Sequence, residues 1–346
     1  MKDRFLAVTN ALRNALEENV FPCANLEIGN SKGTLFQFSE GQRQVMPLHL
    51  QVNKDTLFDM ASVTKIMATT MVTLILVENG LLALSDKMEQ FYDNIPQTSR
   101  DITVKHLLTH TSGIPGGYSI VGCNKKNIDL GILSLPPAYP KETRVEYACL
   151  GFILLGRLIE RVTGKSLDRL AQDMVFGPLS MRSTSFFPKG SNIAATTWDS
   201  TAVGTTNDYN ARYLEVPVGN AGLFSNLSDC STFSRMLLNG GSIDSIRILS
   251  QQTISIATTN HTLAMNEGRC LGFYKFNKGS RIVGELFSQD AFGHTGWTGA
   301  SIAVEPRLDL YVVLLTNRTH MQKYNQENIW RARRLIHNSV ISSLNK

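Results

Sequence analysis

Apolar residues recur at two spacings along this chain, and each spacing predicts a different kind of element. Near the start they lie three or four positions apart, at Phe5, Val8, Leu12 and Leu16. This is the period of an amphipathic helix. Two strand-like runs follow at 23–28 and 33–38, and the polar residues 30–33 between them are typical of a hairpin turn.

Helical spacing dominates the middle of the chain. It is found at 66–77, 103–108, 145–162 and 229–238. The first run is weakly polar and ends at Glu78, which suits a buried helix, and a short strand at 57–58 precedes it. Thr103 can cap the second helix through its hydroxyl, and Gly164 is a common stop for the third. A loop-rich stretch that contains Asn, Thr and Gly spans about 190–222.

The C-terminal part of the chain changes to strand spacing. Strands are predicted at 281–287, 291–293, 300–304 and 310–315. Turn residues separate them at hairpin distances, and a helix over 326–344 closes the chain. Strands therefore lie towards both ends of the chain with helices between them, which predicts an α+β fold.

Composition narrows the class of protein. The chain has 346 residues, which suggests two domains or one large one. Apolar residues make up 42% and charged residues 18%, so we expect a globular chain with a large core. The net charge is +5, and the tight basic cluster Arg331, Arg333 and Arg334 has no interleaved aromatic residues. We therefore expect no nucleic-acid partner, and no run reaches the ~18 apolar residues of a membrane span.

The cysteines and the N-terminus bear on the compartment. The cysteines are Cys23, Cys123, Cys149, Cys230 and Cys270. They are odd in number and have no CxxC spacing, so we expect free thiols in a reducing compartment. Residues 1–4 lack the apolar core of a secretion signal. We expect a cytoplasmic protein, or a periplasmic or extracellular one if a leader has been removed.

Common metal and cofactor motifs are absent from the sequence. It contains no HExxH, no paired Cys/His spacing for zinc, no phosphate loop and no GxGxxG fingerprint. The GxSxG motif of α/β-hydrolases is also absent. His106 and His110 are four residues apart, but His110 follows an expected helix exit. We therefore expect no metal and no cofactor.

An SxxK motif, Ser62-Val63-Thr64-Lys65, remains as candidate chemistry. If Ser62 opens a helix, Lys65 lies one turn further on the same face. A desolvated lysine near the positive end of a helix has a lowered pKa and can take the serine proton. The alternative reading is an ordinary N-cap and a surface charge. The apolar run around Lys65 favours the catalytic reading, whereas a second SxxK at 343–346 has no such context.

Two further segments carry candidate site residues. Tyr147-Ala148-Cys149 lies at the start of a predicted buried helix, where a tyrosine is often only a core residue. The segment 292–299, Phe-Gly-His-Thr-Gly-Trp-Thr-Gly, is dense in glycine at a strand edge. Such glycines allow a ligand to approach the backbone, although a β-bulge or turn has the same signature.

In order and spacing, the three motifs together resemble the serine β-lactamase and penicillin-binding-protein superfamily. That superfamily combines SxxK with YxN or SxN and then [KH]TG, and the resemblance is strongest to its class C β-lactamase-like branch of esterases and D-aminopeptidase or carboxypeptidase-like hydrolases. Further similar stretches lie at 101–114, 151–165, 177–182, 220–225 and 314–318, so the resemblance covers about 20–320.

The resemblance implies the serine β-lactamase/transpeptidase fold. Its antiparallel sheet is flanked by the terminal helices and interrupted by an inserted all-α lobe. The expected α/β lobe is discontinuous and comprises 1–80 plus 236–346, and the mainly helical lobe comprises 81–235.

The resemblance also implies roles for individual residues. Ser62 would be the acyl-forming nucleophile, Lys65 its proton partner, and Tyr147 a proton shuttle to the leaving group. The backbone amides of Ser62 and Trp297 would form the oxyanion hole. The expected substrate-binding residues are Cys149, His294, Thr295, Gly296 and Trp297.

Two positions depart from the family pattern. Cys149 stands where YxN has asparagine, so a weak thiol replaces an amide that contacts substrate and lysine. His294 stands where many members have lysine, so we expect weaker, pH-dependent capture of a substrate carboxylate.

These features predict a serine hydrolase acting through an acyl-enzyme on a small-molecule carboxylic ester or small amide. One alternative is a β-lactamase or a penicillin-binding D-Ala-D-Ala carboxypeptidase. Another is a catalytically silent sensor or binding module. The natural substrate and the oligomeric state are not predicted.

Overall fold

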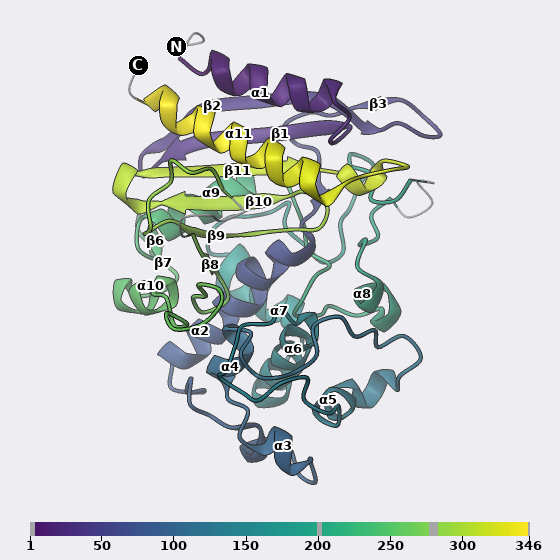
Figure 1. Cartoon of the computed structure of the whole chain (residues 1–346), viewed down its shortest axis with the longest axis vertical. Coiled ribbons are helices and arrows are strands. Elements are labelled where there is room, and N and C mark those ends of the chain that lie inside the picture. Colours follow the sequence, from purple (N-terminus) through teal and green to yellow (C-terminus); the bar gives the residue numbers. More distant parts are fainter. Residues whose placement is uncertain (1–3, 199–202, 277–282, 345–346) are drawn as a thin grey trace.

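A seven-stranded antiparallel sheet organises the computed structural model, which describes residues 4–198, 203–276 and 283–344 (Figure 1). In spatial order the strands are β3 (Leu50–Gln51), β2 (Gly33–Gln44), β1 (Cys23–Asn30), β11 (Leu310–Thr316), β10 (Ser301–Glu305), β9 (Phe292–Thr295) and β8 (Tyr274–Lys275). Strands β1 and β11 pair at the centre, with Ala24 opposite Thr316. The sheet therefore joins the two ends of the chain, and the predicted α+β fold and β1–β2 hairpin are confirmed.

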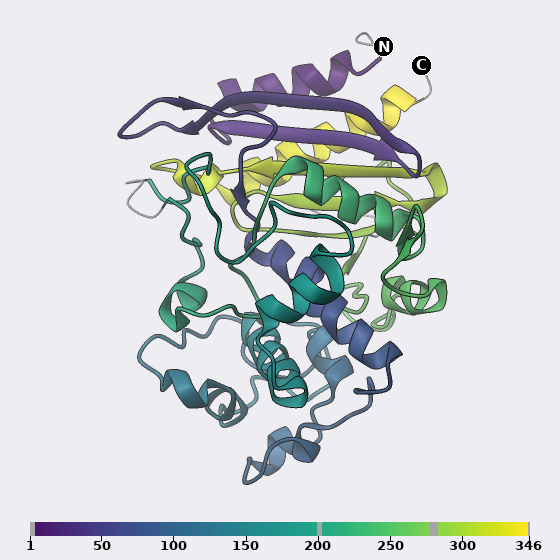
Figure 2. The ribbon, with the colours of Figure 1, turned by 180° about the vertical axis from the view of Figure 1, so that it is seen from behind.

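Helices cover both faces of the sheet. The terminal helices α1 (Leu6–Glu17) and α11 (Gln326–Leu344) lie on one face, and α9 (Leu227–Leu238) packs on β1, β10 and β11 from the other (Figures 1 and 2). Every residue of β11 is buried. Burial on both faces explains why this strand reads as a continuous apolar run rather than an alternating one.

The remaining helices lie mainly on the side of the sheet away from the termini (Figure 1). They are α2 (Met71–Glu78), α3 (Gln97–Arg100), α4 (Val104–Leu108), α5 (Ile128–Leu133), α6 (Cys149–Thr163), α7 (Leu167–Ala171), α8 (Tyr209–Leu214) and α10 (Gln251–Thr258). Short strand pairs join β4 (Phe58–Asp59) to β5 (Phe224–Ser225) and β6 (Ser242–Ile243) to β7 (Ile246–Arg247). The predicted cap of α4 is confirmed, since Thr103 Oγ1 accepts from the His106 amide at 3.2 Å.

The predicted buried helix is part of a longer helical segment. A 3₁₀ turn at Ala61–Val63 and a π-helical stretch at Lys65–Thr70 precede α2. By length and composition alone, Ala61–Glu78 could cross a membrane, which the sequence had not suggested. However, 83% of this window is buried inside the fold, as in the core helix of a globular domain.

Two predicted elements differ from the structure. Helix α6 begins at Cys149 rather than 145, because Ala148 is extended and its amide donates to His110 Nδ1 at 3.1 Å. In the predicted strand 281–287, residues 281 and 282 lie outside the described residues, and 283–287 form turns. Their backbone bonds to a helix instead of a strand, since the Leu286 amide donates to Asn338 Oδ1 of α11 at 3.2 Å. Strand β8 forms the sheet edge in their place.

The predicted division into 1–80 plus 236–346 and 81–235 stays a prediction. Most of helix α9 falls within 81–235, the predicted helical lobe, yet the helix packs on the sheet. The sheet and the central segment Ala61–Glu78 share one large apolar core, which includes Ile66, Val313 and Leu315.

Candidate active site

Ser62 and Lys65 lie at the start of the central helical segment. Lys65 Nζ donates to Ser62 Oγ at 3.0 Å and to the Asn220 carbonyl at 2.8 Å. It also lies 3.5 Å from Cys149 Sγ. The lysine is fully buried, whereas Ser62 is partly exposed. The serine is therefore open to a substrate while its nearest basic group is shielded from water.

Burial controls the charge of Lys65. It lowers the pKa of the ammonium group, and the positive charge of Arg269 acts in the same direction. Cys149 and Asp208 oppose this shift. Neutral Lys65 is consequently easier to form than neutral lysine in water, as a general base requires.

A tight turn presents Ser62. Ala61 has φ +44°, a left-handed conformation that costs a non-glycine residue roughly 1–3 kcal/mol. The Asp59 carboxylate holds this turn by accepting from the Ala61 amide at 2.8 Å and from the Asn207 amide at 2.6 Å. Burial raises the pKa of Asp59 to about 6, although both hydrogen bonds oppose the shift.

Tyr147 reaches the same centre from the extended segment before α6. Lys65 Nζ lies 5.0 Å from the centroid of its ring. Burial raises the pKa of Tyr147 well above its usual value, and the neighbouring Cys149 adds to this. Ser62 and the charge of Arg269 act in the opposite direction. The phenol is therefore neutral at pH 7, and Lys65 is the more readily available base.

The end of β9 closes the site against the turn before Ser62. A Cβ at Gly296 would lie 2.6 Å from the Met60 carbonyl, so only glycine fits. Thr298 Oγ1 donates to the Asp59 carbonyl at 2.7 Å. Trp297 is 50% exposed, and Arg318 donates to its carbonyl at 2.6 Å. The structure thus brings the predicted third motif into contact with the first.

His294 and Thr295 precede this closure on β9. His294 Nδ1 lies 2.8 Å from the Thr295 carbonyl, which can only accept, so Nδ1 carries the hydrogen. Its imidazole is fully buried and its ring centroid is 4.8 Å from that of Tyr274. Burial, with Lys65 and Arg269, lowers its pKa well below 6.5. His294 is therefore neutral, and it lies behind the tyrosine rings rather than at the surface.

Three further residues contact Tyr147, and the sequence marked only His110 among them. The His110 ring lies tilted against it with the centroids 4.6 Å apart, and the Tyr274 ring stacks on it at 6.3 Å. The Arg269 guanidinium carbon lies 5.3 Å from the centroid of the Tyr147 ring. The sequence analysis considered His110 only as a metal ligand, although it belongs to the 101–114 stretch of the resemblance. Arg269 and Tyr274 lie in a loop and an edge strand with no motif to mark them.

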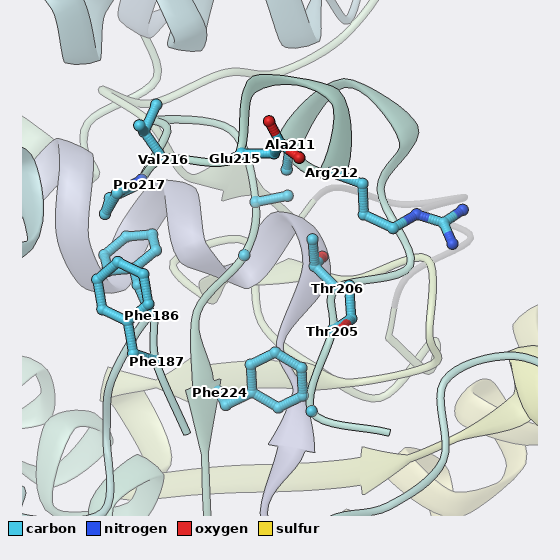
Figure 3. A pocket seen from close by; sticks show the side chains of 13 residues that line it. Phe186, Phe187, Thr205, Thr206, Ala211, Arg212, Glu215, Val216, Pro217 and Phe224 are labelled. Carbon is cyan, nitrogen blue, oxygen red and sulfur yellow. The ribbon is translucent and has the colours of Figure 1, made fainter. Parts of the chain in front are cut away.

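No three His, Cys, Asp or Glu side chains within the described ranges gather closely enough to hold a metal ion. A separate cavity of about 400 Å³ lies beside the loop 204–222 (Figure 3). Phe186, Phe187 and Phe224 line it, with Thr205 and Thr206 also on its wall. Its lining does not include Ser62 or Lys65.

The site combines a serine, a buried lysine and a tyrosine next to an antiparallel sheet. This combination defines the class of SxxK acyl-transfer enzymes. The family model described as Beta-lactamase matches residues 12–336, so the chain belongs to the β-lactamase family and is a hydrolase of it.

The curated relatives of this chain are named as an amidase and as carboxypeptidases. The chain is 30% identical over 311 residues to the "N-acetylmuramyl-L-alanine amidase" of Bacillus subtilis (strain 168), covering 77% of this chain and 68% of that protein. It is 27% identical over 346 residues to the "Putative D-alanyl-D-alanine carboxypeptidase" of Escherichia coli (strain K12), covering 87% and 79%. Among solved structures, a family VIII carboxylesterase has the same fold, with a TM-score of 0.75, 20% identity, and 95% and 96% coverage.

Proposed function

We propose that this protein hydrolyses a carboxylic ester or a small amide through an acyl-enzyme on Ser62. The observation that carries the proposal is the 3.0 Å contact between Ser62 Oγ and the buried Lys65 Nζ. A desolvated lysine at this distance can accept the hydroxyl proton as the oxygen attacks.

Acylation follows from this contact. Ser62 Oγ attacks the substrate carbonyl carbon, its proton passes to Lys65, and the carbonyl electrons move to the oxygen. When the tetrahedral intermediate collapses, the leaving alcohol or amine takes a proton from the Tyr147 hydroxyl. Lys65 then returns its proton to Tyr147, so both groups regain their starting states.

The developing oxyanion needs donors, and the amides of Ser62 and Trp297 are the proposed pair. The close approach of Gly296 to Met60 and the Thr298–Asp59 hydrogen bond support this, because both hold the end of β9 against the nucleophile turn. Donors fixed in this way often supply the largest single part of catalysis. In deacylation, water attacks the acyl carbon and gives one proton to Lys65 while the carbonyl electrons move to the oxygen. Collapse of this second intermediate breaks the bond between the acyl carbon and Ser62 Oγ. Ser62 Oγ takes the proton back from Lys65, and the carboxylic acid is released.

The side of the substrate away from the leaving group meets Cys149, whose thiol donates and accepts weakly. This favours esters and small amides over substrates that depend on an acylamide contact. The names of the curated relatives favour an amide bond, and the departure at Cys149 favours an ester, so both bond types belong in the test.

The test is intact mass spectrometry of the protein after exposure to penicillin and to short-chain p-nitrophenyl esters, alongside ester turnover measured by absorbance. We expect turnover that Ser62→Ala abolishes, and kcat/KM that rises with pH as Lys65 loses its proton. A profile that stays flat from pH 5 to 9 would contradict the role of Lys65.

The same experiment separates the alternatives. A stable penicillin adduct on Ser62 without ester turnover indicates a penicillin-binding protein, and rapid penicillin turnover indicates a β-lactamase. If neither probe reacts with Ser62, the protein is a catalytically silent binding module and the proposal is wrong.

A further inference from the structure

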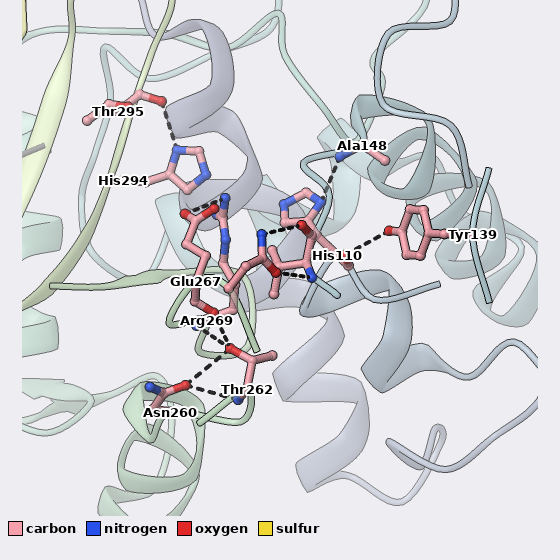
Figure 4. A network of polar contacts seen from close by, with 11 residues as sticks. His110, Tyr139, Ala148, Asn260, Thr262, Glu267, Arg269, His294 and Thr295 are labelled. Atoms are coloured by element: carbon pink, nitrogen blue, oxygen red, sulfur yellow. Dashed lines mark hydrogen bonds and ion pairs between the residues drawn. The ribbon is translucent and has the colours of Figure 1, made fainter. Parts of the chain in front are cut away.

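Arg269 is a buried arginine behind the reactive centre. It is 1% exposed and follows α10 in a loop that fixes its backbone at both ends (Figure 4). Its amide donates to Thr262 Oγ1 at 2.8 Å, and its carbonyl accepts from the His261 amide at 2.7 Å. Arginine is almost never fully buried, because removing its charge from water costs free energy. The burial of Arg269 therefore needs a reason, which we look for in the groups around it.

The guanidinium is held between aromatic rings. Its central carbon lies 3.6 Å from the centroid of Tyr274 and 5.3 Å from that of Tyr147. Nη2 pairs with Glu267 Oε1 at 3.0 Å, and the Glu267 side chain is 39% exposed. The cation is therefore rigidly placed against Tyr147, while its counterion lies partly in water, where its charge is better screened.

The other basic groups near Tyr147 do not supply a fixed charge. His110 and His294 are buried, and their pKa values are lowered well below 6.5, so both are neutral. Lys65 must lose its proton to act. Although burial opposes the charge of Arg269, Tyr274 and Glu267 raise its pKa, so it stays protonated.

We propose that Arg269 is a positioning residue that supplies the permanent positive charge of this active site. It acts through Tyr147 and Lys65 without touching the substrate. The proposal rests on the hydrolase function proposed above.

The direction of its effect can be worked out from the groups it faces. The titratable and charged groups around this centre are Lys65, Cys149, His110, Tyr147, Tyr274, His294, Glu267 and Asp208. The charge of Arg269 disfavours a proton on Lys65 and favours loss of the proton from Tyr147. Both effects extend activity to lower pH. Removing the charge therefore moves the acid limb of the pH profile to higher pH.

The experiment compares pH profiles of kcat/KM for p-nitrophenyl acetate. For Arg269→Gln we expect the acid limb to move to higher pH by about one unit or more, and activity to recover at high pH. Arg269→Lys keeps the charge and stays near the wild type. Glu267→Gln removes the negative charge that opposes Arg269, so we expect the acid limb to move to lower pH, by less than Arg269→Gln moves it to higher pH.

Controls separate electrostatics from structural damage. Arg235 of α9 also pairs with an acidic side chain, since its Nη2 lies 3.2 Å from Asp244 Oδ1 away from the site. Arg235→Gln should leave the acid limb unchanged. A uniform loss of activity at every pH, or the same limb in Arg269→Gln as in the wild type, would overturn the proposal. If Arg269→Gln does not fold, an unshifted limb in Glu267→Gln overturns it instead.

The two proposals fail in different ways. Labelling of wild-type Ser62 by an organophosphonate, read by mass spectrometry, tests the nucleophile independently of the substrate. Without labelling or turnover, the hydrolase function and this inference both fall. With labelling and turnover but no shift of the limb, only the role of Arg269 falls.

Discussion

At the scale of single residues, Cys149 sets this site apart most clearly. Its thiol lies 3.5 Å from Lys65 Nζ, a long contact to a weak acceptor. The lysine makes its shorter bonds to Ser62 and to the Asn220 carbonyl. An asparagine at 149 would offer Lys65 a strong acceptor and a substrate amide both a donor and an acceptor.

Cys149→Asn is therefore expected to raise acylation by β-lactams about fivefold while changing ester turnover much less. The added amide contact is worth roughly 1 kcal/mol, and an acylamide side chain uses it whereas a simple ester does not. Stopped-flow acylation with a chromogenic cephalosporin and with p-nitrophenyl acetate measures both rates. Equal changes for the two substrates would count against this reading. Cys123→Asn, at a half-buried thiol elsewhere, is the matched control.

At the scale of elements, the site depends on how closely β9 approaches the turn before Ser62. Gly296 lies against the Met60 carbonyl, and this contact joins the sheet to the central helical segment. Ordinary side chains at this point would push the strand away and move the Trp297 amide from the carbonyl it is proposed to bind. A misplacement of about 1 Å costs enzymes on the order of 10²-fold in rate.

Gly296→Ala is therefore expected to lower kcat/KM by about 10²-fold or more, because its Cβ would lie 2.6 Å from the Met60 carbonyl. The control is Gly131→Ala in α5, where a Cβ meets nothing within 4 Å. There alanine should leave activity unchanged and stabilise the helix by about 0.5–1 kcal/mol. Ester kinetics and thermal melting follow both variants. Near-normal turnover by Gly296→Ala would show that this contact does not position the site.

The sequence predicted these elements better than their ends. Spacing was enough for the β1–β2 hairpin, the terminal helices and the buried helix before Glu78. It failed at 145–148, because the His110 side chain binds that backbone and keeps it extended. It also failed at 283–287, where α11 rather than a strand provides the hydrogen-bond partner. Both errors come from contacts between residues far apart in the chain.

At the scale of the whole molecule, the sheet separates two cores. The face under α1 and α11 is filled by a cluster that includes Leu12, Ile336 and Val340. The opposite face belongs to the large core around the Ser62 segment. The chain ends meet on the first face, where Arg4 Nε donates to the Ser343 carbonyl at 3.0 Å. The terminal helices and the catalytic centre thus lie on opposite sides of the same sheet.

Leu12→Ala tests this separation. Leu12 is fully buried, so its truncation should lower the free energy of unfolding by about 2–5 kcal/mol. The kcat/KM of the folded protein should stay unchanged, since the site lies across the sheet. Urea denaturation and ester kinetics at low temperature measure the two quantities. Leu6→Ala, at a residue 53% exposed in the same helix, should change neither. A loss of activity in folded Leu12→Ala would show that the two faces are coupled.

The sequence by itself determined the order of the three motifs, the apolar periods of the main elements and the unusual Cys149 and His294. These are local properties, since spacing and residue type are written along the chain. Only the tertiary structure decided that His294 is buried and neutral, that Tyr147 precedes its helix, and that Arg269 lies against Tyr147. Those outcomes depend on burial and on charges brought together from distant segments, and neither is visible until the chain is folded.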